Sequence, residues 1–332
     1  MKKIISIFIL LLTLSSCFKE EDPRPIVSNY ETIALGNDYD NQVFYSLIDT
    51  TIVSNNSYKD WNLAFYCGTD ASYIRLNTAA NMWVVKTNST DFNASFGSIY
   101  NEIDKRFDGS HGLDEQLAID MYMSIGTCID TVFNPIEVYL IHPGIDAEGN
   151  ELGNYKKFMF LGLIYDSYLV RYANLDGSDD RKVLIPKSDN LNFVSYSFSS
   201  HSTVNVEPDK TTWDILFSRF TDTVYTTDLS AFLVGYAVTG AYLNQNSVQA
   251  YLEEDIAYID INSSNIDVSR LSSNLNVIGH DWKQFSDQYY IFLNKSYVVS
   301  DREGRLFKLR FLSFYDDQTG QKGYPSFEFE LL

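Results

Sequence analysis

The feature that most constrains this chain is a tryptophan-led pattern that occurs twice, about 150 residues apart. The first copy runs from Phe44-Tyr45-Ser46-Leu47 to Trp61-Asn62-Leu63-Ala64-Phe65, and the second from Tyr196-Ser197-Phe198 to Trp213-Asp214-Ile215-Leu216-Phe217. The first tyrosine precedes its tryptophan by sixteen residues and the second by seventeen, so spacing and residue types both repeat. Aromatic residues in alternation suit a half-buried pleated surface. Repeats fix architecture, and this one predicts two related β-rich halves that meet near Ser188 to Leu191.

The rest of the chain also favours strands. Short apolar runs alternate with Asn, Asp, Ser and Gly turns over most of its length, which predicts a mainly β protein with antiparallel sheets and few short helices. We expect the N-terminal half to cover residues 30–188 and the C-terminal half residues 189–332. The best helical candidates are Leu113 to Ile125 and Ser247 to Asp255, from apolar spacing and an N-cap residue respectively.

The first residues read as an export signal with a lipid attachment site. Two lysines precede an apolar run from Ile4 to Leu14, which is too short to span a bilayer. The run ends in Leu14-Ser15-Ser16-Cys17, which resembles a bacterial lipobox. We therefore expect a signal peptide at 1–16, lipidation of Cys17, and a linker over 17–29. The acidic run after Cys17 resembles the export tag of outer-membrane surface lipoproteins in Bacteroides-type bacteria.

Charge and cysteine content narrow the function classes. The formal net charge is −19, and removal of residues 1–16 with their two lysines would make it −21. Such an acidic chain argues against nucleic acid as a partner, because nucleic-acid binding requires basic patches. Cys67 and Cys128 would be the cysteines left after lipidation. They are either a disulfide, which an extracytoplasmic location allows, or two small buried residues.

Catalytic signatures are absent from the sequence. There is no His-Glu-x-x-His, no Gly-x-Ser-x-Gly, no phosphate-binding glycine loop and no dinucleotide fingerprint. The protein is therefore not expected to be an enzyme. Of its four histidines, His280 is the best candidate ligand, because Asp281 could orient the ring and Trp282 could cover a planar molecule. The alternative is a turn histidine packed against Trp282.

Four segments of the second half resemble the HmuY family of haem-binding outer-membrane lipoproteins. They are Trp213 to Arg219, Leu233 to Asn244, Gly279-His280-Asp281-Trp282-Lys283, and Lys308 to Tyr315 with the following Gly320 to Pro325. The resemblance is good over Asn192 to Leu332, and Tyr30 to Lys187 is similar to longer members that carry a second half.

This resemblance implies a hand-like, all-β fold that binds b-type haem without covalent attachment and passes it to a TonB-dependent receptor. His280 falls near the place of the family's later iron ligand. For the earlier ligand the chain has neither His nor Met between the Trp213 strand and His280. The nearest substitutes are tyrosines, whose oxygen can ligate haem iron: Tyr236, Tyr242, Tyr251 and Tyr258.

Two functions of different class follow. The first is a cell-surface lipoprotein of the outer membrane that binds haem or a related planar ligand for uptake, with His280 as ligand and Tyr236, Tyr242 and Trp282 as second ligand or pocket. The second is a lipoprotein of an outer-membrane nutrient uptake system that binds another small molecule or a partner and has lost iron ligation.

Overall fold

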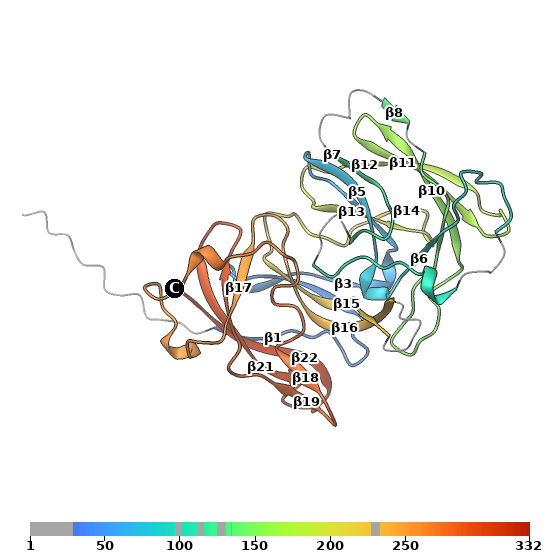
Figure 1. The fold of residues 1–332 in the computed structure, drawn as a ribbon. Coiled ribbons are helices and arrows are strands. Elements are labelled where there is room, and N and C mark those ends of the chain that lie inside the picture. The colour runs from blue at the N-terminus through green and yellow to red at the C-terminus, as the bar shows by residue number, and fades with distance from the viewer. Residues whose placement is uncertain (1–28, 97–100, 112–115, 125–130, 134, 227–232) are drawn as a thin grey trace, which may run out of the picture.

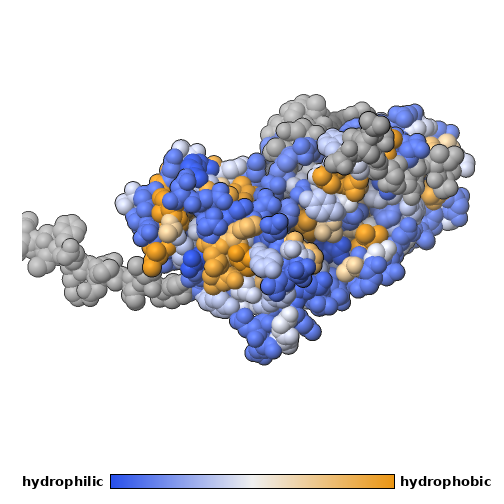
Figure 2. Space-filling view, turned by 60° about the horizontal axis from the view of Figure 1, so that its bottom comes forward, coloured by the Kyte–Doolittle hydropathy of each residue, from blue (hydrophilic) through white to orange (hydrophobic). Residues whose placement is uncertain are grey.

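A computed structural model describes residues 29–96, 101–111, 116–124, 131–133, 135–226 and 233–332. The expected signal peptide, Cys17, most of the linker, and Cys128 lie outside the described residues, so the lipid anchor and the Cys67–Cys128 pairing stay predictions. Cys67 itself is buried. Most of the face in Figure 2 is hydrophilic, with hydrophobic side chains gathered in separate patches.

The described chain is built from antiparallel sheets, which confirms the predicted all-β class (Figure 1). Sheet 1 has the strand order β1 (Asn29–Thr32), β22 (Lys322–Leu331), β21 (Leu306–Tyr315), β20 (Ser296–Ser300) and β17 (Gln249–Glu253). Sheet 2 has the order β16 (Leu233–Leu243), β15 (Ile215–Tyr225), β2 (Asn41–Ser46) and β3 (Thr51–Ser57). A separate hairpin joins β18 (Lys283–Phe285) and β19 (Tyr289–Ile291).

Two further sheets complete the fold. Sheet 3 has the order β14 (Ser202–Val204), β13 (Phe193–Ser197), β4 (Leu63–Tyr66), β5 (Ala71–Leu76) and β7 (Tyr122–Ser124). Sheet 4 has the order β12 (Arg181–Pro186), β11 (Ser167–Asn174), β10 (Lys156–Ile164), β9 (Tyr139–Ile141) and β6 (Val84–Lys86), with β8 (Thr131–Phe133) also paired to β10.

Helical structure in the described residues is limited to single 3₁₀ turns. These are η1 (Tyr58–Asp60), η2 (Thr78–Ala80), η3 (Glu102–Asp104), η5 (Tyr258–Asp260) and η6 (Val268–Arg270). The helix expected over 113–125 is wrong where the structure describes it, because 122–124 form β7. The helix expected over 247–255 is also wrong, since residues 249–253 form β17, which pairs with β20. Cross-strand pairing has overridden local propensity in both places. Among the described residues, no helix is long and apolar enough to cross a bilayer.

The two tryptophan-led patterns occupy equivalent positions, and each lends a strand to the other. β2 of the first copy pairs with β15 of the second, while β13 of the second pairs with β4 of the first. The hydrogen bonds repeat as well. Asp214 Oδ2 accepts from Leu47 N at 2.8 Å, and Asn62 Oδ1 accepts from Phe198 N at 2.7 Å. The two copies of the sequence repeat are thus related by a local pseudo-two-fold axis.

This exchange of strands spreads each core over both parts of the sequence. One hydrophobic core lies among sheets 3 and 4 and includes Tyr58, Phe65, Phe158 and Tyr196. The other lies among sheets 1 and 2 and includes Tyr45, Phe217 and Trp282. β1 to β3 therefore pack with the C-terminal strands and β13 to β14 with earlier strands. The boundary near residue 188 stays a prediction.

Candidate functional site

His280 lies on the wall of an open cleft of about 550 Å³, a volume within the usual range for small-molecule sites. The cleft is bordered by the outer part of β16, the β18–β19 hairpin, and the loop around Asn37 to Tyr39. Its lining mixes aromatic and charged side chains, with Tyr236 and His280 among them. The cleft therefore brings together the leading candidate ligand and one of the tyrosines proposed to assist it.

Close backbone contacts fix the position of His280. Gly279 and Ala241 of β16 exchange two backbone hydrogen bonds of 3.0 Å. This approach needs glycine on both sides. Gly279 has a φ of +55°, and a Cβ on Gly240 would lie 2.2 Å from the Gly279 carbonyl oxygen. The imidazole itself meets the edge of Phe220 with ring centroids 5.9 Å apart. Its orientation thus follows from β15 and β16.

Asp222 links the imidazole to Tyr236. Asp222 and Tyr236 are direct partners across β15 and β16, and the tyrosine hydroxyl donates to Asp222 Oδ2 at 3.2 Å. His280 Nε2 lies 3.7 Å from the same oxygen and 3.7 Å from Asp281 Oδ1. Asp222 was not among the predicted site residues. Its only sequence signal is an acidic residue within an otherwise alternating strand.

The electrostatics favour a neutral imidazole and a protonated phenol. Burial lowers the pKa of His280, and this outweighs the two nearby carboxylates, which act in the opposite direction. Burial first, and then Asp222, raises the pKa of Tyr236. A neutral imidazole has a lone pair available to iron without prior loss of a proton. The tyrosine must lose a proton to present a phenolate.

A buried lysine forms the floor of this cleft. Lys283 is 8% exposed, and burial lowers its pKa to about 7. Its Nζ donates to the Thr239 carbonyl oxygen and lies 4.4 Å from the ring centroid of Trp282 and 4.9 Å from that of Phe314. Lys283 belongs to the segment that carries the family resemblance, but nothing in the sequence marks it as buried.

The other predicted residues lie elsewhere. Trp282 is 1% exposed and stacks on Phe311 in the core with ring centroids 3.9 Å apart, so it does not line the cleft. Tyr242 lines a different, partly open cavity. Tyr251 and Tyr258 are buried, and neither lines the cleft. The structure thus joins Tyr236 with His280 and separates both from Tyr242 and Trp282.

The cleft residues fit haem in part. His280 offers a neutral ring nitrogen, Tyr39, Phe285 and Tyr289 offer aromatic surface, and Lys322 offers a cation for a carboxylate. No group of three or more His, Cys, Asp or Glu side chains suited to a metal ion occurs within the described ranges. A site with one imidazole and a porphyrin needs no such group, since the porphyrin itself supplies ring nitrogens.

Comparison with known proteins supports the same family. The family model described as HmuY protein matches residues 38–137 and 189–329, and so passes over the stretch that contains β9 to β12. The match begins well before the Asn192 to Leu332 region, where the resemblance was expected to be good. No curated protein matches the chain significantly.

Three solved structures are similar along most of their length. They are apo PinO from Porphyromonas gingivitis (9% identity, 92% of this chain and 97% of the other, TM-score 0.25), the apo HmuY analogue of Tannerella forsythia (10%, 94% and 98%, 0.23), and a protein from Bacteroides vulgatus described as HmuY-like and haem-binding (12%, 91% and 90%, 0.21). TM-scores this low support no further comparison. The family model, however, covers more than half of the chain, which therefore belongs to the HmuY family, a family of non-enzymatic haem-binding proteins.

Proposed function

We propose that this protein is a lipoprotein on the outer face of the outer membrane that binds haem, or a related planar ligand, in the His280 cleft. The observation that carries the proposal is the position of a neutral imidazole on the wall of an open cleft of about 550 Å³. Family membership supports haem as the ligand class, because HmuY proteins bind haem.

Each side chain has a distinct part in this proposal. His280 would hold the iron through Nδ1, because Nε2 faces Asp222 and Asp281, and Tyr236 is the second candidate ligand because it lines the same cleft. Asp222 would orient both groups, being within 3.7 Å of the imidazole and 3.2 Å of the phenol oxygen. Bound haem would supply an iron atom for these side chains to ligate. The aromatic walls would exclude water from its faces.

The anchor and the partner complete the proposal. Acylation of Cys17 would tether the protein, since each buried methylene contributes about 0.8 kcal/mol and stable anchoring takes two chains or signals. The open cleft would let the ligand pass to an outer-membrane receptor of the TonB-dependent type. No catalytic step is needed, because haem leaves as it arrived.

A haemin titration of the chain from residue 18 onward tests the proposal. We expect a sharpened Soret band that His280→Ala abolishes and that weakens as the pH falls through the lowered pKa of His280. His201→Ala is a matched control, since its side chain is 30% exposed against 26% for His280 and it contacts Tyr172 instead. An unchanged band in His280→Ala would remove His280 as the ligand.

One observation favours the second function, a binding lipoprotein without iron ligation. Among the described residues that line the cleft, His280 is the single imidazole and no methionine is present. The Tyr236 hydroxyl keeps its proton and donates a hydrogen bond to Asp222. If haemin produced no Soret change in either oxidation state, a non-haem ligand of the same cleft would be the better proposal.

A further inference from the structure

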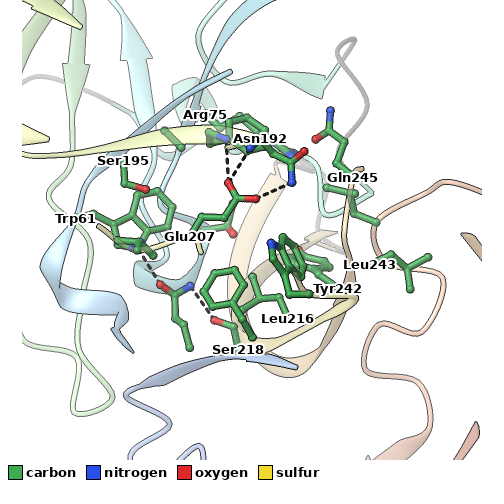
Figure 3. A pocket seen from close by; sticks show the side chains of 18 of the residues that line it. Trp61, Arg75, Asn192, Ser195, Glu207, Leu216, Ser218, Tyr242, Leu243 and Gln245 are labelled. Carbon is green, nitrogen blue, oxygen red and sulfur yellow. Dashed lines mark hydrogen bonds between the residues drawn. The ribbon is translucent and has the colours of Figure 1, made fainter. Parts of the chain in front are cut away.

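A second cavity lies where the two tryptophan-led patterns meet, between sheets 2 and 3 (Figure 3). Its volume is about 140 Å³, and its lining is mostly apolar. Equivalent residues of the two copies face it in pairs, for example Trp61 with Trp213, Ala64 with Leu216, and Leu76 with Leu243. The local pseudo-two-fold axis therefore passes through this cavity. The cavity differs from the His280 cleft in its lining, except that Arg219 borders both.

The equivalent residues differ in the hydrogen bonds that their polar atoms make. Trp61 Nε1 donates to Gln42 Oε1 at 2.8 Å, so the first indole is satisfied. Trp213 is 5% exposed, and its Nε1 has no partner at hydrogen-bond distance among the described residues, although it lies near enough to the Glu207 carboxyl to lower the pKa of that group. Gln245 Oε1 likewise has no hydrogen-bond partner among them. Arg75 Nε also lines the cavity without a hydrogen-bond partner and lies 4.0 Å from Asp108 Oδ2. Two buried donors and one buried acceptor thus line the cavity unpaired among the described residues, and each costs about 1–3 kcal/mol if left so.

A carboxyl group completes the polar side. Glu207 Oε2 accepts from the backbone amides of Asn192 and Phe193 at 3.1 and 2.9 Å, and Oε1 accepts from Asn192 Nδ2 at 2.6 Å (Figure 3). Burial raises the pKa of Glu207 to about 7. Arg75 and Arg219 also line the cavity, yet burial still disfavours the charge of its own carboxylate, and an anionic ligand would be disfavoured for the same reason.

We propose that this cavity is a binding site for an uncharged single-ring aromatic molecule that carries one hydroxyl group. The size agrees, because an engineered apolar cavity of roughly 150 Å³ takes up benzene. The polar atoms agree too, since a phenolic hydroxyl can accept from Trp213 Nε1 and donate to Gln245 Oε1. Water is the competing occupant. The unpaired polar atoms could hold one or two water molecules, but the mostly apolar remainder of the lining offers water no partners.

Ligand-observed NMR on the chain from residue 18 onward, with phenol and toluene as probes, tests the proposal. We expect phenol to bind about tenfold more tightly than toluene, the factor of one net hydrogen bond. Ala64→Leu fills the cavity and should abolish phenol binding, whereas Ala257→Leu, at an exposed position, should leave it unchanged. Gln245→Met should remove the preference for phenol but keep toluene binding.

The outcomes separate this site from the haem cleft. His280→Ala should leave phenol binding unchanged even if it abolishes the Soret band. A thermal melt of Ala64→Leu shows that the variant is folded. Failure of both probes to bind would mean that the cavity holds water only, and equal binding of the two would remove the role of Trp213 and Gln245. Phenol binding that survives Ala64→Leu would place it elsewhere. Each of these three results overturns the proposal.

Discussion

Replacing Lys283 with methionine tests whether burial or the surrounding aromatic rings determine the protonation state of the Lys283 amine. Two effects oppose each other at this side chain. Burial disfavours the ammonium form and lowers the pKa to about 7 from an ordinary value of 10.5. The rings of Trp282 and Phe314 favour the ammonium form through cation–π contacts. The effect of pH on stability shows which of the two is larger.

The magnitude follows from linkage. A shift of about 3.5 pKa units corresponds to about 5 kcal/mol against the charged form, at 1.36 kcal/mol per unit. Each cation–π contact returns about 0.5–2 kcal/mol, so desolvation should remain the larger effect. Because the folded-state pKa is lowered, the unfolded chain binds more protons above pH 7, and stability rises with pH there. Integrated from about pH 7 to about pH 9, the gain is about 2 kcal/mol.

Urea unfolding of the wild type and of Lys283→Met across this pH range measures the effect. We expect the difference in unfolding free energy between the two to change by about 2 kcal/mol in favour of the wild type as the pH rises. The lost hydrogen bond to Thr239 shifts the variant equally at every pH. Lys182→Met, at an exposed position, should follow the wild type. A constant difference between wild type and Lys283→Met would mean that the aromatic cage holds an ordinary ammonium ion, which would refute the reasoning.

Three further variants test the framework around the two cavities. Gly240→Ala should cost about 1–3 kcal/mol and weaken haemin binding, because its Cβ would collide with Gly279; thermal melts and Soret titration measure both effects. Asn62→Asp copies the residue type of Asp214 without its arginine partner at a half-buried position, so chemical denaturation should show a loss of about 1 kcal/mol at pH 7 that shrinks in acid. Because folding raises the pKa of Glu207 to about 7, its protonated carboxyl contributes fully to the free energy of unfolding below about pH 4.5, and this contribution is lost as the pH rises through about 7. Glu207→Gln should therefore flatten the pH dependence of urea unfolding in that range.

Much of the strand content and the equivalence of the two tryptophan-led patterns could be predicted from the sequence. Periodicity and spacing are local, and each pattern fixes its own strands. What could not be predicted is that β2 pairs with β15 and β4 with β13, because nothing local says which of two similar strands is the partner. The short β17 shows the same limit. Its pairing with β20 is a tertiary contact that its residues do not encode alone.

The candidate site could likewise be predicted only in part. His280 was selected because Asp281 could orient its ring and Trp282 could cover a planar ligand, and because it falls near the family's later iron ligand. The structure places it in a cleft. Asp222 was missed because a single acidic residue in a strand has no distinctive pattern. Trp282 was expected to cover a ligand because it follows His280 by two residues. In the structure its side chain instead enters the core and stacks on Phe311, an orientation that depends on packing and not on sequence distance.

The separation of the two tyrosines on β16 explains why the protein has two distinct cavities. Tyr236 and Tyr242 are six residues apart, which at about 3.4 Å per residue places them roughly 20 Å from each other along the strand. One small ligand cannot contact both hydroxyls. Phe220 of β15 lies between the two sites, with ring centroids 4.4 Å from Tyr242 and 5.9 Å from His280. The strand pair β15–β16 is therefore a shared wall, and Arg219 of β15 lines both cavities.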